Sequence, residues 1–168
     1  MTPENIVTRR ESPSDAAAVE ALHRLAFGPG AYARAAFRVR EQAPHDVALS
    51  FVTLRDGELI ASVRLTPIFV GECNGHLLGP LVVDPCCKGQ GHGKMLLGLA
   101  VEEARKARSP FIVLVGDEPY YGPFGFRPLP PGTVLMPGPV DPARLLVAEL
   151  EPGAAAGLAG MVRGARLR

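Results

Sequence analysis

Cysteine, net charge and long apolar runs are all scarce in this sequence, and each scarcity excludes a class of protein. The cysteines are Cys73, Cys86 and Cys87, and because two of them are adjacent they provide neither a disulfide framework nor the Cys-x-x-Cys spacing of a zinc site. We therefore expect no metal ion and a reducing compartment. A formal charge of +1 at pH 7 is too small for a protein that neutralises nucleic-acid phosphates.

Signals for export or membrane insertion are also missing. The first residues, Met-Thr-Pro-Glu-Asn, lack the basic stretch and apolar core of a signal peptide, and no stretch approaches the ~20 apolar residues of a membrane span. We expect a soluble, cytoplasmic protein. The 47% of apolar residues predict a folded chain, and its length predicts one domain over residues 1–168 that buries roughly 70% of its unfolded surface.

The most informative stretch is residues 81–94, Leu-Val-Val-Asp-Pro-Cys-Cys-Lys-Gly-Gln-Gly-His-Gly-Lys. An apolar run stops at Pro85, three alternate glycines follow, and a helical pattern begins. Without Cβ atoms the glycines let several backbone N–H groups approach one anion, and the helix start adds unpaired N–H groups and a positive dipole end. The pattern predicts a pyrophosphate site, although a glycine-rich surface turn has the same local sequence.

Hydrophobic periodicity predicts mixed strands and helices around this stretch. Ser12 and Asp15 form a capping box before the first helix, Asp56-Gly57 predicts a hairpin, and Gly79-Pro80 inside a strand predicts a bulge that leaves backbone groups unpaired. Strands are expected at residues 6–10, 47–55, 58–70, 76–83, 111–115, 133–136 and 145–150, and helices at 13–27, 31–42 and 92–108. The chain beyond residue 153 stays unassigned.

Two motifs and the order of these elements resemble the GNAT superfamily of acyl-CoA-dependent N-acetyltransferases. The family signature, Gln or Arg followed by x-x-Gly-x-Gly or Ala after a strand ending Val-x-Pro, is similar to residues 83–93, with Lys88 in place of the Gln or Arg. A tyrosine five residues before the Phe of a Gly-Phe pair occurs as Tyr121 and Phe126. Residues 78–83 and 145–153 resemble in particular its branch of small bacterial YhbS-like acetyltransferases.

The resemblance implies an α/β (α+β) fold of the GNAT three-layer type, in which a mixed, mostly antiparallel sheet is splayed at its fourth strand and flanked by helices. It also implies acetyl-CoA as cosubstrate, with the pantetheine arm beside that strand and the pyrophosphate at the glycine turn. The coenzyme-binding residues implied are Leu81, Val82, Val83, Lys88, Gly89, Gln90, Gly91, His92, Gly93 and Lys94. For Lys88 and Lys94 a solvated surface position is the alternative.

In such an enzyme an acceptor amine attacks the thioester carbonyl directly. A backbone N–H, at Val82 or Val83 here, would stabilise the oxyanion, and a phenol would protonate the leaving thiolate. The family position makes Tyr121 the general acid, with aromatic packing as the alternative role and Tyr120 as the less favoured candidate.

The general base is harder to identify from the sequence. Asp117 and Glu118 follow a buried strand, but strand-end or helix-capping roles are favoured for both. His76 and His92 have no partner that the sequence identifies, and His23 is expected at the surface of a helix.

Other nucleotide motifs fail here. A Walker loop needs glycine at the position of Lys88 and Ser or Thr at that of Met95, and the Rossmann spacing G-x-G-x-x-G does not match three alternate glycines. The main alternative to an enzyme is a non-catalytic acyl-CoA-binding regulatory module of the same fold. A third is an interaction domain that binds no coenzyme.

The acceptor is expected to be a small-molecule or peptide amine. Neither nucleic acid nor a membrane is expected as a partner, and a homodimer is an open alternative. The acceptor cleft should come from variable segments, here residues 22–42 and 128–142. Arg34, Arg38 and Arg40 predict a solvated helix face, with recognition of an acceptor carboxylate as the alternative.

Overall fold

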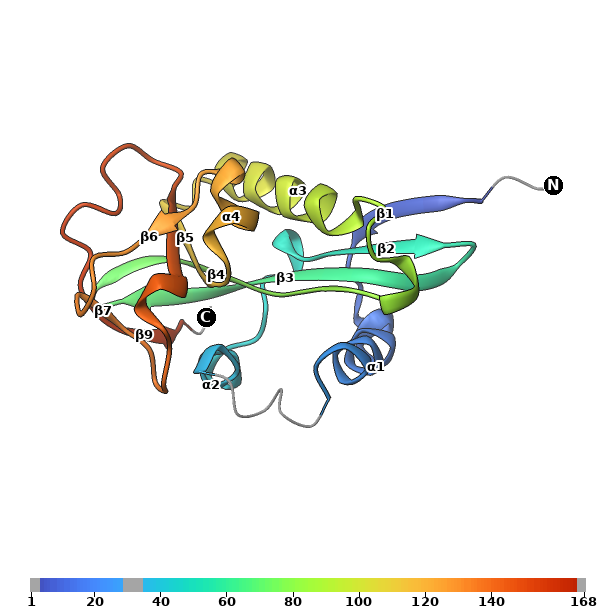
Figure 1. Ribbon diagram of the computed structural model, residues 1–168, viewed down its shortest axis with the longest axis horizontal. Helices are drawn as coiled ribbons and strands as arrows, with labels where there is room; N and C mark the ends of the chain where they lie inside the picture. The colour runs from blue at the N-terminus through green and yellow to red at the C-terminus, as the bar shows by residue number, and fades with distance from the viewer. Residues whose placement is uncertain (1–3, 29–34, 166–168) are drawn as a thin grey trace.

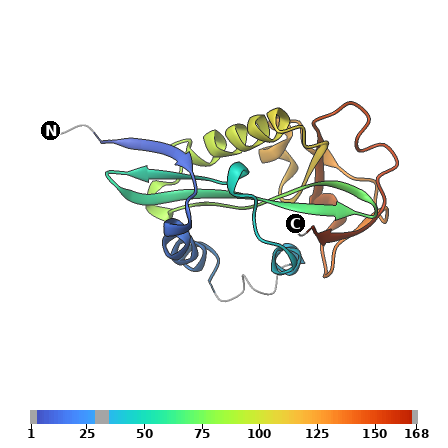
Figure 2. The same cartoon turned by 180° about the vertical axis from the view of Figure 1, so that it is seen from behind.

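The computed structural model describes residues 4–28 and 35–165, which form a twisted sheet between two layers of helices (Figure 1). Helices α3 and α4 cover one face of the sheet, and α1 and α2 lie on the other (Figures 1 and 2). The helices are α1 (Ala16–Phe27), α2 (Ala35–Gln42), α3 (His92–Lys106) and α4 (Glu118–Tyr121). The predicted start of the second helix, at residues 31–34, lies outside the described residues.

The strands follow the predicted, mostly antiparallel arrangement. They are β1 (Ile6–Arg10), β2 (Phe51–Arg55), β3 (Glu58–Val70), β4 (Cys73–Val83), β5 (Phe111–Val115), β6 (Arg127–Pro128), β7 (Val134–Leu135), β8 (Leu145–Glu149) and β9 (Gly160–Gly164). The main order is β1-β2-β3-β4-β5-β8-β6, with β9 paired to β3 and β7. Only the β4–β5 and β7–β9 pairs are parallel among the described strands. The predicted fold class is confirmed.

Strand β4 is interrupted at the predicted place. The register of the β3–β4 pair shifts between Val63 and Leu65, so that Gly79 and Pro80 face the single residue Arg64. Two residues opposite one define a β-bulge, which bends the strand and disturbs its hydrogen-bond ladder. The Gly-Pro pair accounts for this bulge, because proline cannot donate to a ladder. We call the bulge at Gly79 and Pro80 the break in β4.

Beyond the bulge β4 also leaves its other neighbour. The parallel β4–β5 pairing is limited to His76 and Leu77 on β4, opposite Ile112 and Val113 on β5. From residue 78 onward the edge of β4 that faces β5 is therefore open. This splay, predicted from the resemblance, creates the space for a ligand.

Helix α3 attaches the glycine turn to the sheet. Leu96, Leu97, Ala100 and Ala104 are completely buried, in the periodic pattern that the sequence predicts. Each buried leucine contributes about 1.5–3 kcal/mol relative to an exposed one. The N-terminus of α3 is thus held in a fixed position beside β4.

The turn before α1 confirms the predicted capping box. The Ser12 N–H donates to Oδ2 of Asp15 at 2.7 Å, and Arg9 donates to both carboxylate oxygens at 2.7 and 2.9 Å. The hydrogen bonds from Arg9, aided by those from Ser12, outweigh burial and hold the pKa of Asp15 at about 2. Helix α1 then buries Val19 and Leu22 toward the sheet.

Three local predictions are wrong or incomplete. Residues Val47–Leu49 form a 3-10 turn instead of the start of a strand, because the Asp46 carboxylate accepts the N–H of Ala48 at 3.0 Å. The segment after β5, for which the sequence predicts neither strand nor helix, contains α4. The unassigned tail contributes β9, which pairs with residues 68–70 of β3.

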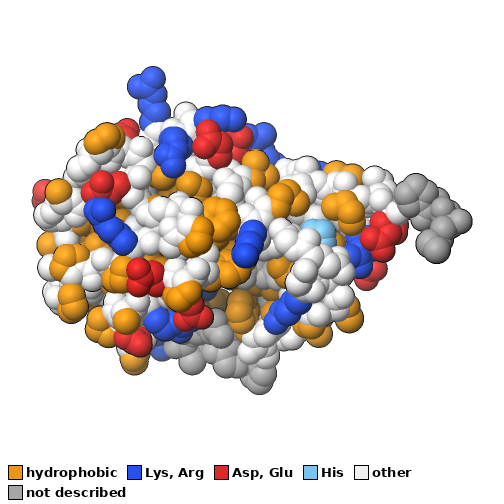
Figure 3. Space-filling model, turned by 45° about the horizontal axis from the view of Figure 1, so that its top comes forward, with side chains coloured by type: hydrophobic (Ala, Val, Ile, Leu, Met, Phe, Trp, Pro, Cys, Tyr) orange, Lys and Arg blue, Asp and Glu red, His pale blue; other side chains and the backbone are white. Residues whose placement is uncertain are grey.

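The surface agrees with the low net charge. On the face shown in Figure 3, Lys and Arg side chains are interspersed with acidic and apolar side chains. No helix within residues 4–28 and 35–165 has the length and apolar character needed to cross a membrane.

Candidate active site

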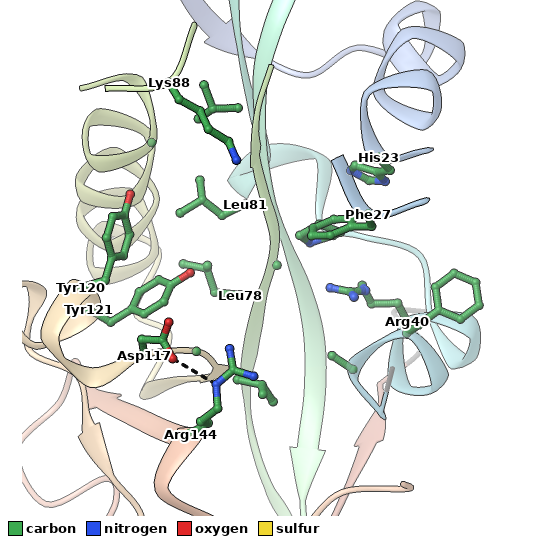
Figure 4. A pocket seen from close by; sticks show the side chains of 18 of the residues that line it. His23, Phe27, Arg40, Leu78, Leu81, Lys88, Asp117, Tyr120, Tyr121 and Arg144 are labelled. Atoms are coloured by element: carbon green, nitrogen blue, oxygen red, sulfur yellow. Dashed lines mark hydrogen bonds and ion pairs between the residues drawn. The ribbon is translucent and has the colours of Figure 1, made fainter. Parts of the chain in front are cut away.

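A cleft of about 990 Å³, here called the central cleft, lies along the open edge of β4 (Figure 4). One wall comes from the start of α3, from α4 and from the segment after β5, and the opposite wall comes from α1 and α2. Small-molecule sites range from about 300 to 1,000 Å³. The central cleft has room for a large cofactor arm and a second reactant.

The backbone of β4 presents hydrogen-bonding groups to this cleft. The N–H of Asp84 donates to the carbonyl of Ile60 at 2.8 Å, so Asp84 points its N–H toward β3. Because backbone groups alternate along a strand, Val82 also faces β3, where it pairs with Ser62. The N–H groups of Leu81 and Val83 therefore face the open side.

The glycine turn closes one end of the central cleft. Gly89 and Gly91 have φ angles of +81° and +87°, a backbone conformation that is strained for every residue except glycine. Gly91 is the N-cap of α3, so the free N–H groups of the first helical turn begin at the cleft. The amino group of Lys88 extends into the same end (Figure 4).

Most of the predicted coenzyme residues meet in this cleft. Its lining includes Leu81, Val83, Lys88, Gly89, Gly91, His92, Gly93 and Lys94, together with Tyr121. The structure does not bring Val82 or Gln90 to the lining. The side chain of Val82 is buried on the other face of β4, and the amide oxygen of Gln90 accepts hydrogen bonds from Arg55 and from Nε2 of His92.

Tyr121 projects from α4 toward the break in β4. Its hydroxyl points toward Leu78 in Figure 4, and its ring lies directly on Gly116, where any Cβ would clash with it. Burial raises the pKa of Tyr121 to about 12, and the neighbouring Tyr120 and Asp117 add to the shift. The hydroxyl therefore keeps its proton at any physiological pH.

Tyr120 points elsewhere although it is adjacent in sequence. Its hydroxyl runs along α3 (Figure 4) and would lie 2.8 Å from a Cβ atom placed on Gly93. The two rings meet edge to face, with centroids 4.9 Å apart. The structure thus separates the two phenols, one toward the strand break and one toward the helix start.

The two carboxylates considered as the general base lie in different places. Nε of Arg144 donates to the carboxylate of Asp117 at 3.2 Å, and the carbonyl of Asp117 accepts the N–H groups of Tyr120 and Tyr121 at 3.1 Å each. Asp117 is therefore the N-cap residue of α4 through its backbone carbonyl, whereas its side chain makes no capping hydrogen bond, and the residue lines the central cleft. Glu118 is exposed and does not line the central cleft.

His76 belongs to a separate, partly buried cluster. Its Nδ1 lies 2.7 Å from Oγ of Ser109 and its Nε2 lies 3.4 Å from Oδ2 of Asp46. These residue types occur in hydrolytic triads, but Ser109 is buried and donates its hydroxyl hydrogen to the carbonyl of Phe111 at 3.2 Å. The cluster fastens the segment before β2 to β4 and β5.

The wall formed by α1 and α2 lies largely within residues 22–42, which the sequence predicts for the acceptor side, but that prediction does not single out His23 or Phe27. His23, expected at the surface, is half-buried and lines the cleft together with Phe27 and Arg40 (Figure 4). Burial, with the nearby charges of Arg64 and Arg40, lowers the pKa of His23 to about 4. The spacing of His23 and Phe27, four residues apart on one helix face, is the signal that could have paired them.

The chain matches the model of the acetyltransferase (GNAT) family over residues 17–122. It is similar to the uncharacterised N-acetyltransferase YhbS of Escherichia coli K12, with 29% identity over 124 residues that cover 73% of this chain and 74% of YhbS.

The chain is also similar to solved structures of acetyltransferases. The crystal structure of E. coli YhbS in complex with CoA is similar with a TM-score of 0.81 and 26% identity, over 98% of this chain and 92% of that one. A GNAT family acetyltransferase from Brucella melitensis in complex with acetyl-CoA has a TM-score of 0.65 and 27% identity, over 88% and 90% of the two chains.

Proposed function

Because the chain belongs to the acetyltransferase (GNAT) family, we propose that it transfers an acetyl group from acetyl-CoA to a primary amine by direct attack. One observation carries the proposal: the open edge of β4, the glycine turn of α3 and the Tyr121 hydroxyl all face the central cleft. Similar structures from E. coli and B. melitensis hold CoA and acetyl-CoA, and we extend that ligand to this chain.

The coenzyme would bind mainly to backbone groups. Its pantetheine amides would pair with the open backbone of Leu81 and Val83, and its pyrophosphate would meet the N–H groups of residues 89–94. Backbone recognition explains why Lys88 can replace the usual Gln or Arg of the family signature. Lys88 and Lys94 would add positive charge at the phosphate end.

The reaction needs one new bond and one proton at sulfur. The amine nitrogen attacks the thioester carbon, the N–C bond forms, and the oxyanion is stabilised by the N–H of Leu81, which faces the cleft beside the break in β4, rather than by that of Val82 or Val83. The C–S bond then breaks and Tyr121 donates its proton to sulfur, while the nitrogen loses a proton to solvent and Tyr121 regains one from solvent. The products are an amide and CoA.

The proposal is tested by binding and turnover together. Millimolar acetyl-CoA should raise the melting temperature, since a ligand at 100 times its Kd stabilises by about 2.7 kcal/mol. A panel of primary amines should then release CoA thiol in the presence of the protein. A melting curve that does not move would overturn coenzyme binding, and binding without thiol release from any amine would favour the regulatory module instead.

Replacing Gly91 with valine should abolish the acetyl-CoA-dependent rise in melting temperature. A β-branched residue at a φ of +87° is strained, so the backbone of the turn must change and move its N–H groups away from the phosphates. We expect at least a tenfold loss of acetyl-CoA affinity, measured by calorimetry.

Gly57 provides the matched control for that variant. It has a φ of +83° at the tip of the β2–β3 hairpin, outside the central cleft, and a Cβ there would meet open space just as at Gly91. Gly57→Val should lose comparable stability and keep the acetyl-CoA response. If both variants respond to acetyl-CoA equally, the glycine turn does not hold the pyrophosphate.

Replacing Gly116 with alanine should lower kcat by about 100-fold through Tyr121, because small displacements of reacting groups cost rates of that order. The new Cβ would occupy the position of the Tyr121 ring and push its hydroxyl away from the break in β4. Gly98→Ala is the control, since its Cβ would make an ordinary contact of 3.4 Å with Phe124. Equal kcat values in both variants would contradict the role given to the position of Tyr121.

A further inference from the structure

We propose that the acceptor is a compact amino acid whose carboxylate binds the guanidinium of Arg40, while its amine attacks the thioester beside the break in β4. This inference rests on the proposed function and adds the substrate class. It also revises the expectation that the arginines of the second helix form a solvated face, because Arg38 is exposed whereas Arg40 lines the central cleft.

Arg40 lies at the place where the two reactants would meet. Its side chain extends from α2 across the cleft toward β4 (Figure 4). Nη1 of Arg40 would lie 3.0 Å from a Cβ atom placed on Gly79, so the guanidinium touches the bulge itself. An anion bound by Arg40 is therefore held beside the segment along which we place the acetyl group.

Burial distinguishes Arg40 from the other charges of the cleft. The other charged residues in its described lining are all exposed, and they are Glu20, Arg24, Lys88, Lys94, Asp117, Asp141 and Arg144. Arg40 alone is half-buried. Exposed charges are screened by water and salt, whereas a partly desolvated guanidinium forms strong, bidentate hydrogen bonds with a carboxylate.

His23 adds a second polar group to this wall. Its Nε2 is buried without a hydrogen-bond partner among the described residues, and its imidazole is uncharged at neutral pH because its pKa is about 4. Because Nε2 is covered by protein atoms, His23 forms an uncharged part of the wall beside Arg40, and we assign it no hydrogen bond to the acceptor. An uncharged imidazole neither repels the guanidinium of Arg40 nor forms an ion pair with it.

The position of Arg40 limits the length of the acceptor. Gly79 and Leu81 are two residues apart, which is at most about 7 Å because the bulge shortens the strand. The carboxylate at Arg40 and the amine at the thioester must span a distance of this order. Amino acids with one to a few carbon atoms between the two groups fit, whereas the termini of an extended peptide do not.

The test compares each acceptor with its own amide. Thiol release from acetyl-CoA is measured with glycine, β-alanine, 4-aminobutyrate and the standard amino acids, each beside its primary amide, and with spermidine and a lysine peptide. The protein, Arg40→Gln, Arg40→Lys and Arg38→Gln are compared. For the unsubstituted protein, we expect kcat/KM to be at least tenfold higher for each carboxylate form than for its amide.

In Arg40→Gln the kcat/KM for carboxylate acceptors should fall about 10- to 100-fold, mostly through KM, since a hydrogen bond to a charged group is lost. The values for the amides should not change, and neither should the acetyl-CoA-dependent shift in melting temperature. Arg40→Lys, which keeps the charge and loses the fork, should be intermediate. Arg38→Gln should behave as the unsubstituted protein.

Each other result has a defined meaning. If amides, spermidine or the peptide react as well as the carboxylates, the proposed function stands and the acceptor class is wrong. If Arg40→Gln lowers kcat equally for acids and amides, Arg40 acts on the thioester and does not bind a carboxylate. If acetyl-CoA binds and no amine reacts, the proposed function fails, and the acceptor class with it.

Discussion

Replacing Tyr121 with phenylalanine should lower kcat for acetyl transfer by about 100-fold or more and leave acetyl-CoA binding unchanged, since a positioned general acid contributes about 10² to 10⁴ in rate. The substitution removes only the hydroxyl that points toward the break in β4 (Figure 4). The ring that packs on Gly116 and, edge to face, on Phe126 remains. A pure packing role for Tyr121 predicts no change in kcat, so the variant separates the two roles that the sequence leaves open.

The pH profile gives an independent check on the same assignment. Because burial, aided by Tyr120 and Asp117, raises the pKa of Tyr121 to about 12, the phenol stays protonated through the range in which amines lose their protons. The rate should rise with pH as the acceptor amine is deprotonated. No decrease in rate is expected at any pH lower than about 11. A falling limb near pH 8 or 9 would point to a different acid.

Tyr120→Phe is the comparison variant. The Tyr120 hydroxyl lies near Gly93 at the start of α3, where we place the coenzyme, so its loss should change mainly the KM for acetyl-CoA. A large loss of kcat in Tyr120→Phe together with a normal kcat in Tyr121→Phe would exchange the roles of the two residues.

The coenzyme half of the site is predictable because its signals are local. Glycines in a turn, an alternating apolar strand and an amphipathic helix are each encoded within about 15 residues, and Gly79-Pro80 identifies the break in β4 for the same reason. The prediction that Val82 and Gln90 bind the coenzyme cannot be made from local signals of this kind. Which edge of β4 a backbone N–H faces depends on its register with β3, and the Gln90 amide is fixed by Arg55 from a distant hairpin.

The acceptor half depends on packing between elements far apart in the sequence. Arg38 and Arg40 have the same local surroundings, yet successive residues turn by about 100° around a helix, so the two side chains point in nearly opposite directions. Only the position of α2 against the sheet determines which one enters the cleft. The tail shows the same limit, because β9 is rich in glycine and forms a strand only where β3 offers an edge to pair with.

Replacing Glu11 with glutamine should lower the free energy of unfolding by about 3–5 kcal/mol, the usual cost of removing one partner from a buried ion pair. The carboxylate is 2% exposed, accepts hydrogen bonds from Nε and Nη2 of Arg64 at 2.9 Å each, and lies 3.2 Å from Nε2 of His45. An amide can satisfy some of these donors but not the charge of Arg64. Arg64 is also the residue opposite the bulge at Gly79-Pro80, so the loss should loosen the wall that carries the acceptor site.

The effect should depend on pH in a defined direction. Burial alone would raise the pKa of Glu11, but hydrogen bonds from His45 and Arg64, with their charges, hold it at about 2 instead of its ordinary 4.5. A carboxylate whose pKa is lowered on folding stabilises the protein above the unfolded pKa, and the contribution is lost as pH falls from about 5 toward 2. The difference between Glu11→Gln and the unsubstituted protein should therefore shrink over that interval.

Urea denaturation at pH 7 and at pH 3 measures both parts of this prediction, and Glu102→Gln is its matched control. Glu102 pairs with Arg105 at 3.9 Å across two half-exposed side chains, a contact worth at most about 1 kcal/mol. Part of the acid sensitivity should persist in Glu11→Gln, because the Asp15 carboxylate also has a pKa of about 2. If Glu11→Gln and Glu102→Gln lose the same stability at pH 7, the buried pair does not hold the end of β1 against the bulge, and the acceptor wall must be fixed by its apolar contacts alone.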